Sequence, residues 1–305
     1  MICADIMKKQ DLLTMAGCNL CPRKCGADRS TMKGFCRAGN RITLGRAGLH
    51  FWEEPCISGL GGSGTIFFSG CNMGCIFCQN MPLSRGLTGK EITVKRLREI
   101  FSELIYDGAD NINLVTPSHF VPEIIEALSE ERLPVPVIYN TSSYEETDTI
   151  KRLEGLIDIY LPDLKYISPS LSKAFSNAPD YAEKAIPAIK EMYRQKNKAV
   201  FDEDDMLQSG IIIRHLVLPG HIDNTYDVID AVTENFPQDV MFSLMSQYTP
   251  PKKKLKFEEL NRRLTEEEYN MAVDYMYLSG IENGFLQELS SAKEEYTPAF
   301  DLTGV

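Results

Sequence analysis

Strand-like and helix-like stretches alternate through the middle of the chain. Short runs of β-branched and aromatic residues predict buried strands. These runs cover residues 65–69, 111–115, 135–139, 158–161, 211–218 and 241–244. Between them apolar residues recur at the spacing of an amphipathic helix, as at Val94, Leu97, Ile100 and Phe101. The pattern contains six strand–helix units, and such alternation predicts an α/β fold with a parallel sheet.

The same spacing predicts further helices at residues 121–128, 182–195 and 224–232. Thr265 and the acids that follow it indicate a capped helix start near the C-terminus. We therefore divide the chain into three parts. They are an N-terminal Cys-rich metal-binding module over residues 1–60, a barrel body over 61–250 and a C-terminal helical extension over 251–305.

Composition is that of an ordinary soluble globular protein. Of the 305 residues, 43% are hydrophobic and 25% are charged. No apolar run approaches the ~20 residues of a membrane span, and the first residues lack the apolar core of a signal peptide. We expect a cytoplasmic protein without a membrane partner.

Charge is distributed unevenly along the chain. The first 60 residues carry nine Lys/Arg and five Asp/Glu, whereas the whole chain has a net charge of −11. An acidic body argues against nonspecific binding to nucleic acid. The basic N-terminal part would favour the thiolate form of nearby cysteines, although a solvated basic surface is the alternative.

Nine cysteines all lie before residue 79. An odd number confined to one quarter of the chain favours metal binding over disulfides. Cys71, Cys75 and Cys78 follow the predicted strand at 65–69 with the spacing Cys-x3-Cys-x2-Cys. A [4Fe-4S] cluster normally takes four thiolates, so three would leave one iron open to a ligand. The alternatives are an incomplete zinc site and inert buried thiols.

A second group of cysteines lies nearer the N-terminus. Its four members are Cys18, Cys21, Cys25 and Cys36. Four thiolates suit a structural zinc ion and a fully ligated iron-sulfur cluster equally well, and a reduced, metal-free segment is the third interpretation. Cys56 is either a core thiol or a substitute ligand, and we expect Cys3 to be a free thiol.

Several of these stretches together resemble a known superfamily. The Cys-x3-Cys-x2-Cys spacing, Phe77 before the last cysteine and the preceding strand resemble the radical S-adenosylmethionine enzymes. The stretch from His50 to Asn80 resembles the subgroup of pyruvate formate-lyase-activating enzymes. Residues 18–26 resemble the N-terminal element of the same subgroup. The resemblance spans roughly residues 18–250.

The resemblance implies a fold and a chemistry. The fold is an open partial (β/α)6 TIM-like barrel. The cofactors are a [4Fe-4S] cluster on Cys71, Cys75 and Cys78 and S-adenosylmethionine on the open iron. Reductive cleavage then yields methionine and a 5'-deoxyadenosyl radical for hydrogen abstraction, which makes the expected enzyme a radical oxidoreductase.

The resemblance also implies which residues contact S-adenosylmethionine. Asp163 and Lys165 match an Asp-Leu-Lys element that lies close to the carboxylate and sulfonium, where the Asp helps hold a monovalent cation. Arg214 lies within an apolar run and needs a buried partner. The family's Gly-Gly-Glu-like turn is missing after residues 111–115, so the residues there are assigned by position alone, and a capping or surface role is the alternative for His119. The expected cofactor-binding residues are Phe77, Thr116, Ser118, His119, Asn140, Thr141, Asp163, Lys165, Arg214 and Gln247.

The subgroup implies partners as well. They are an external electron donor of the flavodoxin or ferredoxin type and a glycyl radical enzyme whose backbone glycine loses the hydrogen. In the activating enzymes with auxiliary clusters, those clusters follow the three cysteines, whereas the four-cysteine group here precedes them. Radical modification of another peptide or small molecule is therefore an alternative. A non-catalytic electron-transfer or zinc-structural protein is a third function, from a different class.

Overall fold

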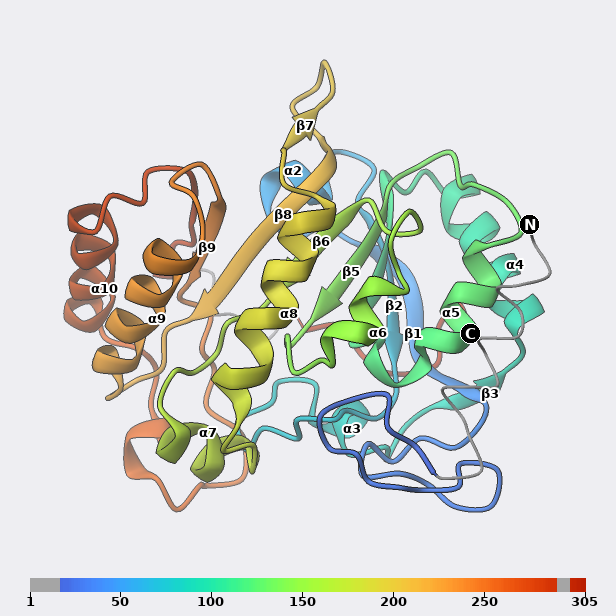
Figure 1. The fold of residues 1–305 in the computed structure, drawn as a ribbon, viewed down its shortest axis with the longest axis horizontal. Helices are drawn as coiled ribbons and strands as arrows, with labels where there is room; N and C mark the ends of the chain where they lie inside the picture. The colour runs from blue at the N-terminus through green and yellow to red at the C-terminus, as the bar shows by residue number, and fades with distance from the viewer. Residues whose placement is uncertain (1–16, 290–296) are drawn as a thin grey trace.

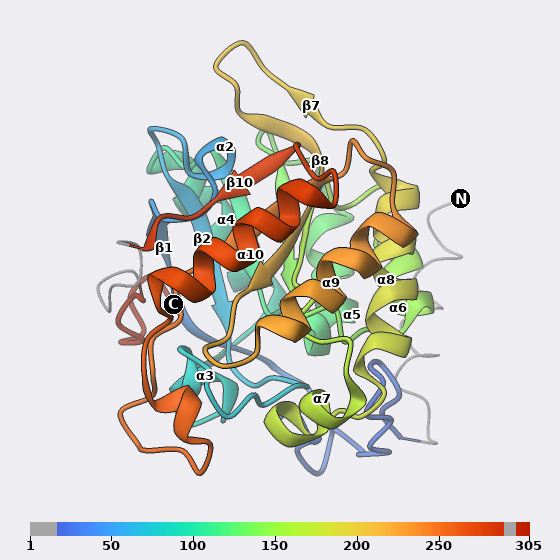
Figure 2. The same ribbon diagram turned by 90° about the vertical axis from the view of Figure 1, so that its left-hand side faces the viewer.

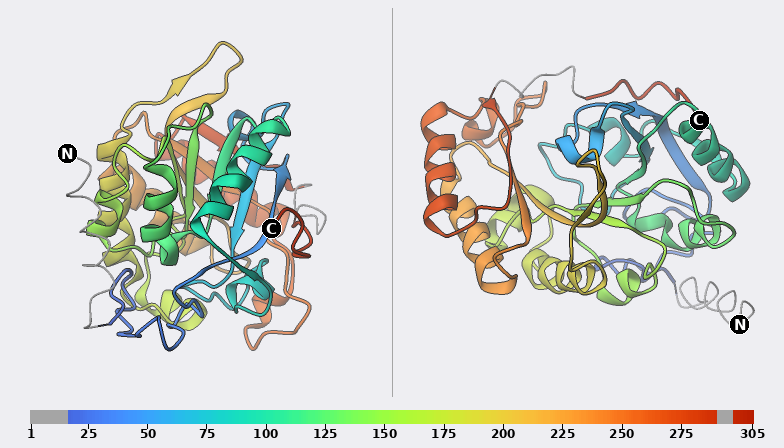
Figure 3. Two further views of the ribbon diagram at one scale, coloured as in Figure 1. Left: turned by 90° about the vertical axis from the view of Figure 1, so that its right-hand side faces the viewer. Right: turned by 90° about the horizontal axis from the view of Figure 1, so that it is seen from above.

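The computed structural model describes residues 17–289 and 297–305, so Cys3 lies outside the described residues. In this part of the chain the strands form one curved sheet with helices along its outer face (Figure 1, Figure 3). The strands are β1 (Ile42–His50), β2 (Ser63–Phe68), β3 (Lys90–Ile92), β4 (Asn111–Val115), β5 (Val137–Thr141), β6 (Ile159–Pro162), β7 (Val200–Phe201), β8 (Leu207–Leu216), β9 (Met241–Met245) and β10 (Gly284–Leu286). The helices are α2 (Pro55–Ser58), α3 (Met81–Ser84), α4 (Val94–Tyr106), α5 (Val121–Leu128), α6 (Thr147–Lys151), α7 (Pro169–Ser176), α8 (Tyr181–Gln195), α9 (Ile222–Asn235) and α10 (Glu266–Leu278), with 3-10 turns η1 (Ser118–Phe120) and η2 (Glu258–Asn261).

The sheet order confirms the α/β fold expected from the alternating pattern. Strands β2, β4, β5, β6, β8 and β9 pair in parallel in that spatial order. Each is followed by at least one helix, which is the arrangement of a partial barrel. Four further strands belong to the sheet: β10 pairs in parallel with β9, whereas β1, β3 and β7 are antiparallel to their neighbours.

Local sequence explains where the outer helices begin. The Thr93 side chain accepts from the backbone N–H of Arg96 at the start of α4. At α10, Thr265 and Glu268 form the capping box that the sequence predicted. Helix α10 packs against α9 beyond the sheet edge (Figure 2). Across residues 17–289 and 297–305, every helix falls short of the length and apolar character that crossing a membrane requires.

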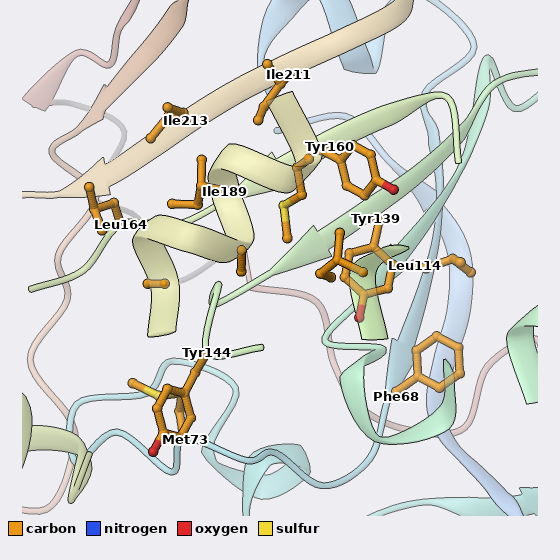
Figure 4. Close-up of a cluster of buried hydrophobic side chains, with 14 of the residues drawn as sticks. Phe68, Met73, Leu114, Tyr139, Tyr144, Tyr160, Leu164, Ile189, Ile211 and Ile213 are labelled. Carbon is orange, nitrogen blue, oxygen red and sulfur yellow. The ribbon is translucent and has the colours of Figure 1, made fainter. Parts of the chain in front are cut away.

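Side chains of the strands alternate between two apolar layers. Tyr139, Tyr160 and Ile213 point toward the helices, where Ile189 of α8 packs among them (Figure 4). Their strand neighbours face inward, where they pack with α2 in a smaller cluster of Cys56, Ile57, Ile138, Ile159, Leu161, Leu207, Ile212 and Met241. This two-sided burial is what a parallel sheet requires. It leaves room in the interior toward the carboxyl ends of the strands.

Candidate cluster and cofactor site

A cavity of about 240 Å³ opens at the carboxyl ends of the parallel strands. The loop that follows β2 forms one wall, and residues from the ends of β4, β5, β6 and β8 form the others. This is the edge at which ligands bind in parallel α/β proteins. Helix α3 and the N-terminal segment lie at the same end of the molecule (Figure 1).

All three cysteines of the Cys-x3-Cys-x2-Cys loop border this cavity. Gly70 and Gly74 have φ values of 95° and 66°, a conformation that glycine adopts readily. Burial, together with the neighbouring Cys75 and Cys78, raises the pKa of Cys71 to about 12. Bound iron would instead favour the thiolate. The donor set therefore fits a cluster held by three thiolates.

The N-terminal segment holds this loop in place. Arg23 donates from Nε to the carbonyl oxygen of Asn72 at 2.7 Å and from Nη2 to that of Ser176 at 2.8 Å. The backbone N–H of Cys71 donates to the carbonyl oxygen of Cys36 at 3.1 Å. One arginine and one peptide group thus connect the four-cysteine segment to the cavity loop.

Gly70→Ala is expected to disturb this connection. A methyl group at Gly70 would lie 2.3 Å from the carbonyl oxygen of Cys36, which is the acceptor for Cys71. Gly108→Ala is the matched control, because Gly108 has a φ of 93° with nothing within 4 Å of the added methyl. The control should cost about 1 kcal/mol through its backbone conformation. Gly70→Ala should cost a further ~1–3 kcal/mol through the clash.

Urea denaturation measures both costs, and iron analysis after anaerobic reconstitution shows whether the loop still loads. Equal costs and equal iron contents for the Gly70 and Gly108 variants would contradict the coupling of the two segments.

A buried charge group forms the opposite wall of the cavity. Arg214 donates from Nε to Asp163 Oδ1 at 3.0 Å, from Nη2 to Asn140 Oδ1 at 2.7 Å and from Nη1 to Glu53 Oε2 at 3.1 Å. Lys165 Nζ donates to Asp163 Oδ2 at 2.6 Å. The buried partners that the sequence required for Arg214 are therefore carboxylates of the chain itself.

Burial and the two cations, Lys165 and Arg214, determine the protonation states of the carboxyl groups in this charge group. Burial opposes ionisation of Asp163, yet Lys165 and Arg214 outweigh it and lower the pKa of that carboxyl. For Glu53 and Glu54 burial prevails, and the pKa of each is raised despite Arg214. Burial likewise opposes the charge on Lys165, but Asp163 raises the pKa of its ammonium group. At neutral pH the chain presents an ammonium and a guanidinium to the cavity.

Eight of the ten residues expected to bind the cofactor border this cavity. They are Phe77, Thr116, Asn140, Thr141, Asp163, Lys165, Arg214 and Gln247. The Phe77 ring packs against Phe175 and Tyr248, with centroids 6.2 and 5.9 Å away. Phe77 thus provides an apolar part of the cavity wall beside the thiols, and the other two rings pack behind it.

The structure does not bring Ser118 and His119 to the cavity. His119 is fully buried, its Nε2 lies 2.9 Å from the carbonyl oxygen of Ser69, and burial lowers its pKa to about 4. Ser118 donates to Glu145, which also accepts from Thr141 at 2.6 Å. Burial raises the pKa of Glu145 to about 7. Ser118 and His119 thus belong to the packing behind the cavity wall, because the 3-10 turn η1 begins at Ser118, directly after Pro117.

Sequence reasoning missed the acidic residues of the site. Glu53 and Glu54 lie in the segment between β1 and α2, and their side chains are only 13% and 7% exposed. Two adjacent acids usually indicate a solvated surface. The apolar residues around them, Trp52 and Pro55, were the available sign that this stretch enters the interior.

The four N-terminal cysteines lie in one compact segment. Cys18, Cys21 and Cys36 are buried and Cys25 is exposed. A methyl group at Gly34 would lie 3.3 Å from Cys25 Sγ and 3.5 Å from Cys36 Sγ, so the glycine leaves space between two of the thiols. Within residues 17–289 and 297–305, no set of three or more His, Cys, Asp or Glu side chains is close enough together to enclose a single metal ion.

Comparison with known proteins finds similarity to a protein of Methanocaldococcus jannaschii and to several solved structures. The chain is 30% identical over 267 residues to the uncharacterized protein MJ0674 of Methanocaldococcus jannaschii, covering 84% of this chain and 73% of the relative. No protein-family model matches it.

Similar solved structures include Streptococcus suis SuiB bound to S-adenosylmethionine, with 14% identity, a TM-score of 0.48 and coverage of 75% of this chain. The chain spans about half of SuiB, 51% of its length. Methylornithine synthase (PylB) has 14% identity, a TM-score of 0.47 and coverage of 92% of this chain and 77% of that one. A domain of pyruvate-formate lyase-activating enzyme from Bacteroides vulgatus has 11% identity, a TM-score of 0.37 and coverage of 56% and 91%.

Proposed function

The chain belongs to the family of the uncharacterized protein MJ0674, and from the geometry of its site we propose that it is a radical S-adenosylmethionine enzyme. One observation supports this most strongly. The three thiols of Cys71, Cys75 and Cys78 border the same cavity as the charge group of Asp163, Lys165 and Arg214. A bound cluster would supply an open iron and a low-potential electron for reductive cleavage of the sulfonium.

The protein's own residues bind and orient the nucleotide in this proposal. Lys165 offers a point charge to the carboxylate of S-adenosylmethionine, and Asp163 keeps that ammonium group in place at 2.6 Å. Phe77, which is 7% exposed, provides an apolar surface for the adenine ring. The buried position of these groups excludes water from a reactive intermediate.

Product analysis tests the proposal. After anaerobic reconstitution with iron and sulfide, the protein is reduced with dithionite and mixed with S-adenosylmethionine. We expect methionine and 5'-deoxyadenosine in equal amounts. A fully reconstituted protein that releases neither product would contradict the proposal and favour a non-catalytic electron-transfer or zinc-structural protein.

We further propose a backbone glycine of a partner enzyme as the source of the hydrogen, with a flavodoxin- or ferredoxin-type protein as electron donor. The support is the resemblance of the stretch from His50 to Asn80 to the activating enzymes. Mixing with candidate partners from the same genome should give the doublet of a glycyl radical in electron paramagnetic resonance. Silence from every candidate would instead favour modification of another peptide or a small molecule.

For the four N-terminal cysteines we propose a second metal site, with zinc or an iron-sulfur cluster as occupant. The space between Cys25 and Cys36 at Gly34 supports this, and the thiols would have to move closer together to enclose a single zinc ion. Iron, sulfide and zinc counts on the wild type and on a variant lacking Cys18 and Cys21 distinguish the two metals.

A further inference from the structure

A second cavity, of about 280 Å³, adjoins the first. Five residues border both cavities: Trp52, Glu53, Arg214, Met245 and Gln247. The cysteine trio borders the first cavity and is absent from the lining of the second. The second cavity therefore has its own lining chemistry, and it meets the first cavity at a shared wall, which is formed by the five residues that border both.

Carboxylates outnumber cations around this shared wall. Arg214 is contacted by Asp163 at 2.9 Å, by Glu53 at 3.1 Å and by Glu54 at 3.9 Å. Lys165 pairs with Asp163 on the far side. Two cations thus face three buried carboxylates. A buried carboxylate without full compensation is costly, so the group can accept one more positive charge.

Glu54 has the free capacity for that charge. Its side chain is 7% exposed and borders the second cavity. Its Oε2 atom is buried and has no hydrogen-bond partner, and the closest guanidinium nitrogen of Arg214 is 3.9 Å away. This finding adds to the count of carboxylates, because it identifies one atom, Glu54 Oε2, that has no hydrogen-bond donor.

Apolar and aromatic side chains form much of the remaining lining. Phe51 and Trp52 are 49% and 53% exposed, and Met245, Phe285 and Leu286 lie around the same space. Ser243, Gln287 and Glu288 add oxygen atoms to the lining, and a small inorganic cation, which prefers a shell of oxygen ligands, is therefore the competing occupant. An alkyl chain that ends in a positive charge matches both parts, because aromatic faces attract ammonium groups and apolar walls cover methylenes.

We propose that the second cavity binds an ammonium group on an alkyl chain of the substrate, with Glu54 as its hydrogen-bond acceptor and Trp52 beside it. This substrate assignment rests on the proposed function. The charged end is anchored at Glu54, and the remainder of the substrate extends past Arg214 and Gln247 toward the cofactor cavity. The same chemistry is offered by a lysine side chain in a peptide and by a free amine.

Titration calorimetry on the reconstituted full-length protein tests the site with three probes. They are Nα-acetyl-lysine methylamide, 1,5-diaminopentane and the uncharged Nα-acetyl-norleucine methylamide. We expect at least one ammonium probe to bind about tenfold or more tightly than the neutral one. Tighter binding of the lysine derivative supports a peptide substrate, and tighter binding of the diamine supports a free amine.

Two variants connect the preference to the named residues. Glu54→Gln should abolish it, whereas Glu191→Gln should preserve it, because Glu191 is an equally buried carboxylate that pairs with Arg194 on α8. Trp52→Leu changes an exposed side chain, so it does not depend on the fold tolerating a buried substitution. It should weaken ammonium binding about threefold.

Equal binding of charged and neutral probes by the wild type would overturn the site. So would a preference that survives both Glu54→Gln and Trp52→Leu, or a cavity in which MgCl2 or KCl binds while the ammonium probes do not. Wild-type cleavage of S-adenosylmethionine is measured separately. Cleavage without ammonium binding therefore refutes only the substrate site, and ammonium binding without cleavage refutes only the proposed function.

Discussion

Cys71→Ala is expected to abolish both the visible absorption of a reconstituted cluster and the release of 5'-deoxyadenosine. Cys71, Cys75 and Cys78 border one cavity, and a [4Fe-4S] cluster is held by cysteine thiolates. With two thiolates left, the cluster would lose one of its three protein anchors. Iron and sulfide analysis measures the first loss, and chromatography of the products after dithionite reduction measures the second.

Cys56→Ala is the matched control for this loss. Cys56 is also buried, but it packs with Ile57 and Ile138 in the inner apolar cluster rather than at the cavity. This variant should retain its iron and its products, with a stability loss of about 1 kcal/mol. Full iron content and product release in Cys71→Ala would refute the assignment of Cys71, Cys75 and Cys78 as cluster ligands.

Arg214→Met is expected to cost about 3–5 kcal/mol in the free energy of unfolding at pH 8. The guanidinium contacts Asp163, Glu53 and Glu54, and its side chain is 10% exposed. Its removal leaves buried carboxylates next to one another with Lys165 as the remaining cation. Urea denaturation measures the cost, and equilibrium dialysis should show weaker binding of S-adenosylmethionine.

The cost should depend on pH in a defined direction. Burial already raises the pKa of Glu53 and Glu54, and loss of Arg214 raises both further. A carboxyl whose pKa is higher in the folded state stabilises the fold at low pH and loses that contribution as pH rises. The difference between wild type and Arg214→Met should therefore be smaller at pH 5 than at pH 8.

Arg96→Met is the control for removing an arginine from an ion pair. The Arg96 side chain is 30% exposed and pairs with Glu99 and Glu103, which are 46% and 53% exposed. Such surface pairs contribute about 0–1 kcal/mol. Similar costs for the two variants, or a cost for Arg214→Met that does not change with pH, would contradict the role given to the buried charge group.

Hydrophobic periodicity alone predicted the central architecture. The helix expected at residues 182–195 is α8 (Tyr181–Gln195), and the strand expected at 241–244 is β9 (Met241–Met245). Periodicity succeeds here because each element buries a whole face. The strand expected at 135–139 is instead β5 (Val137–Thr141). Pro136 has no N–H for a ladder hydrogen bond, and the shift places Asn140 and Thr141 inside the strand.

Hydrophobic periodicity does not predict elements that bury little apolar surface. Strands β3 (Lys90–Ile92) and β10 (Gly284–Leu286) are three residues long and partly exposed, so they have no period to detect. Their pairing depends on sheet edges that other parts of the chain create. The position of Glu53 and Glu54 has the same origin, because burial of α2 beneath the sheet brings them to Arg214.

Truncation of the N-terminal segment would remove two contacts described above. Cys36 accepts a hydrogen bond from Cys71, and Arg23 donates to Asn72 and Ser176. The barrel without its first forty residues would lack the peptide oxygen and the guanidinium that complete the thiol loop. A shortened version of the chain would need substitutes for both groups. The N-terminal segment is in that sense part of the scaffold of the cavity, whether or not it binds a metal.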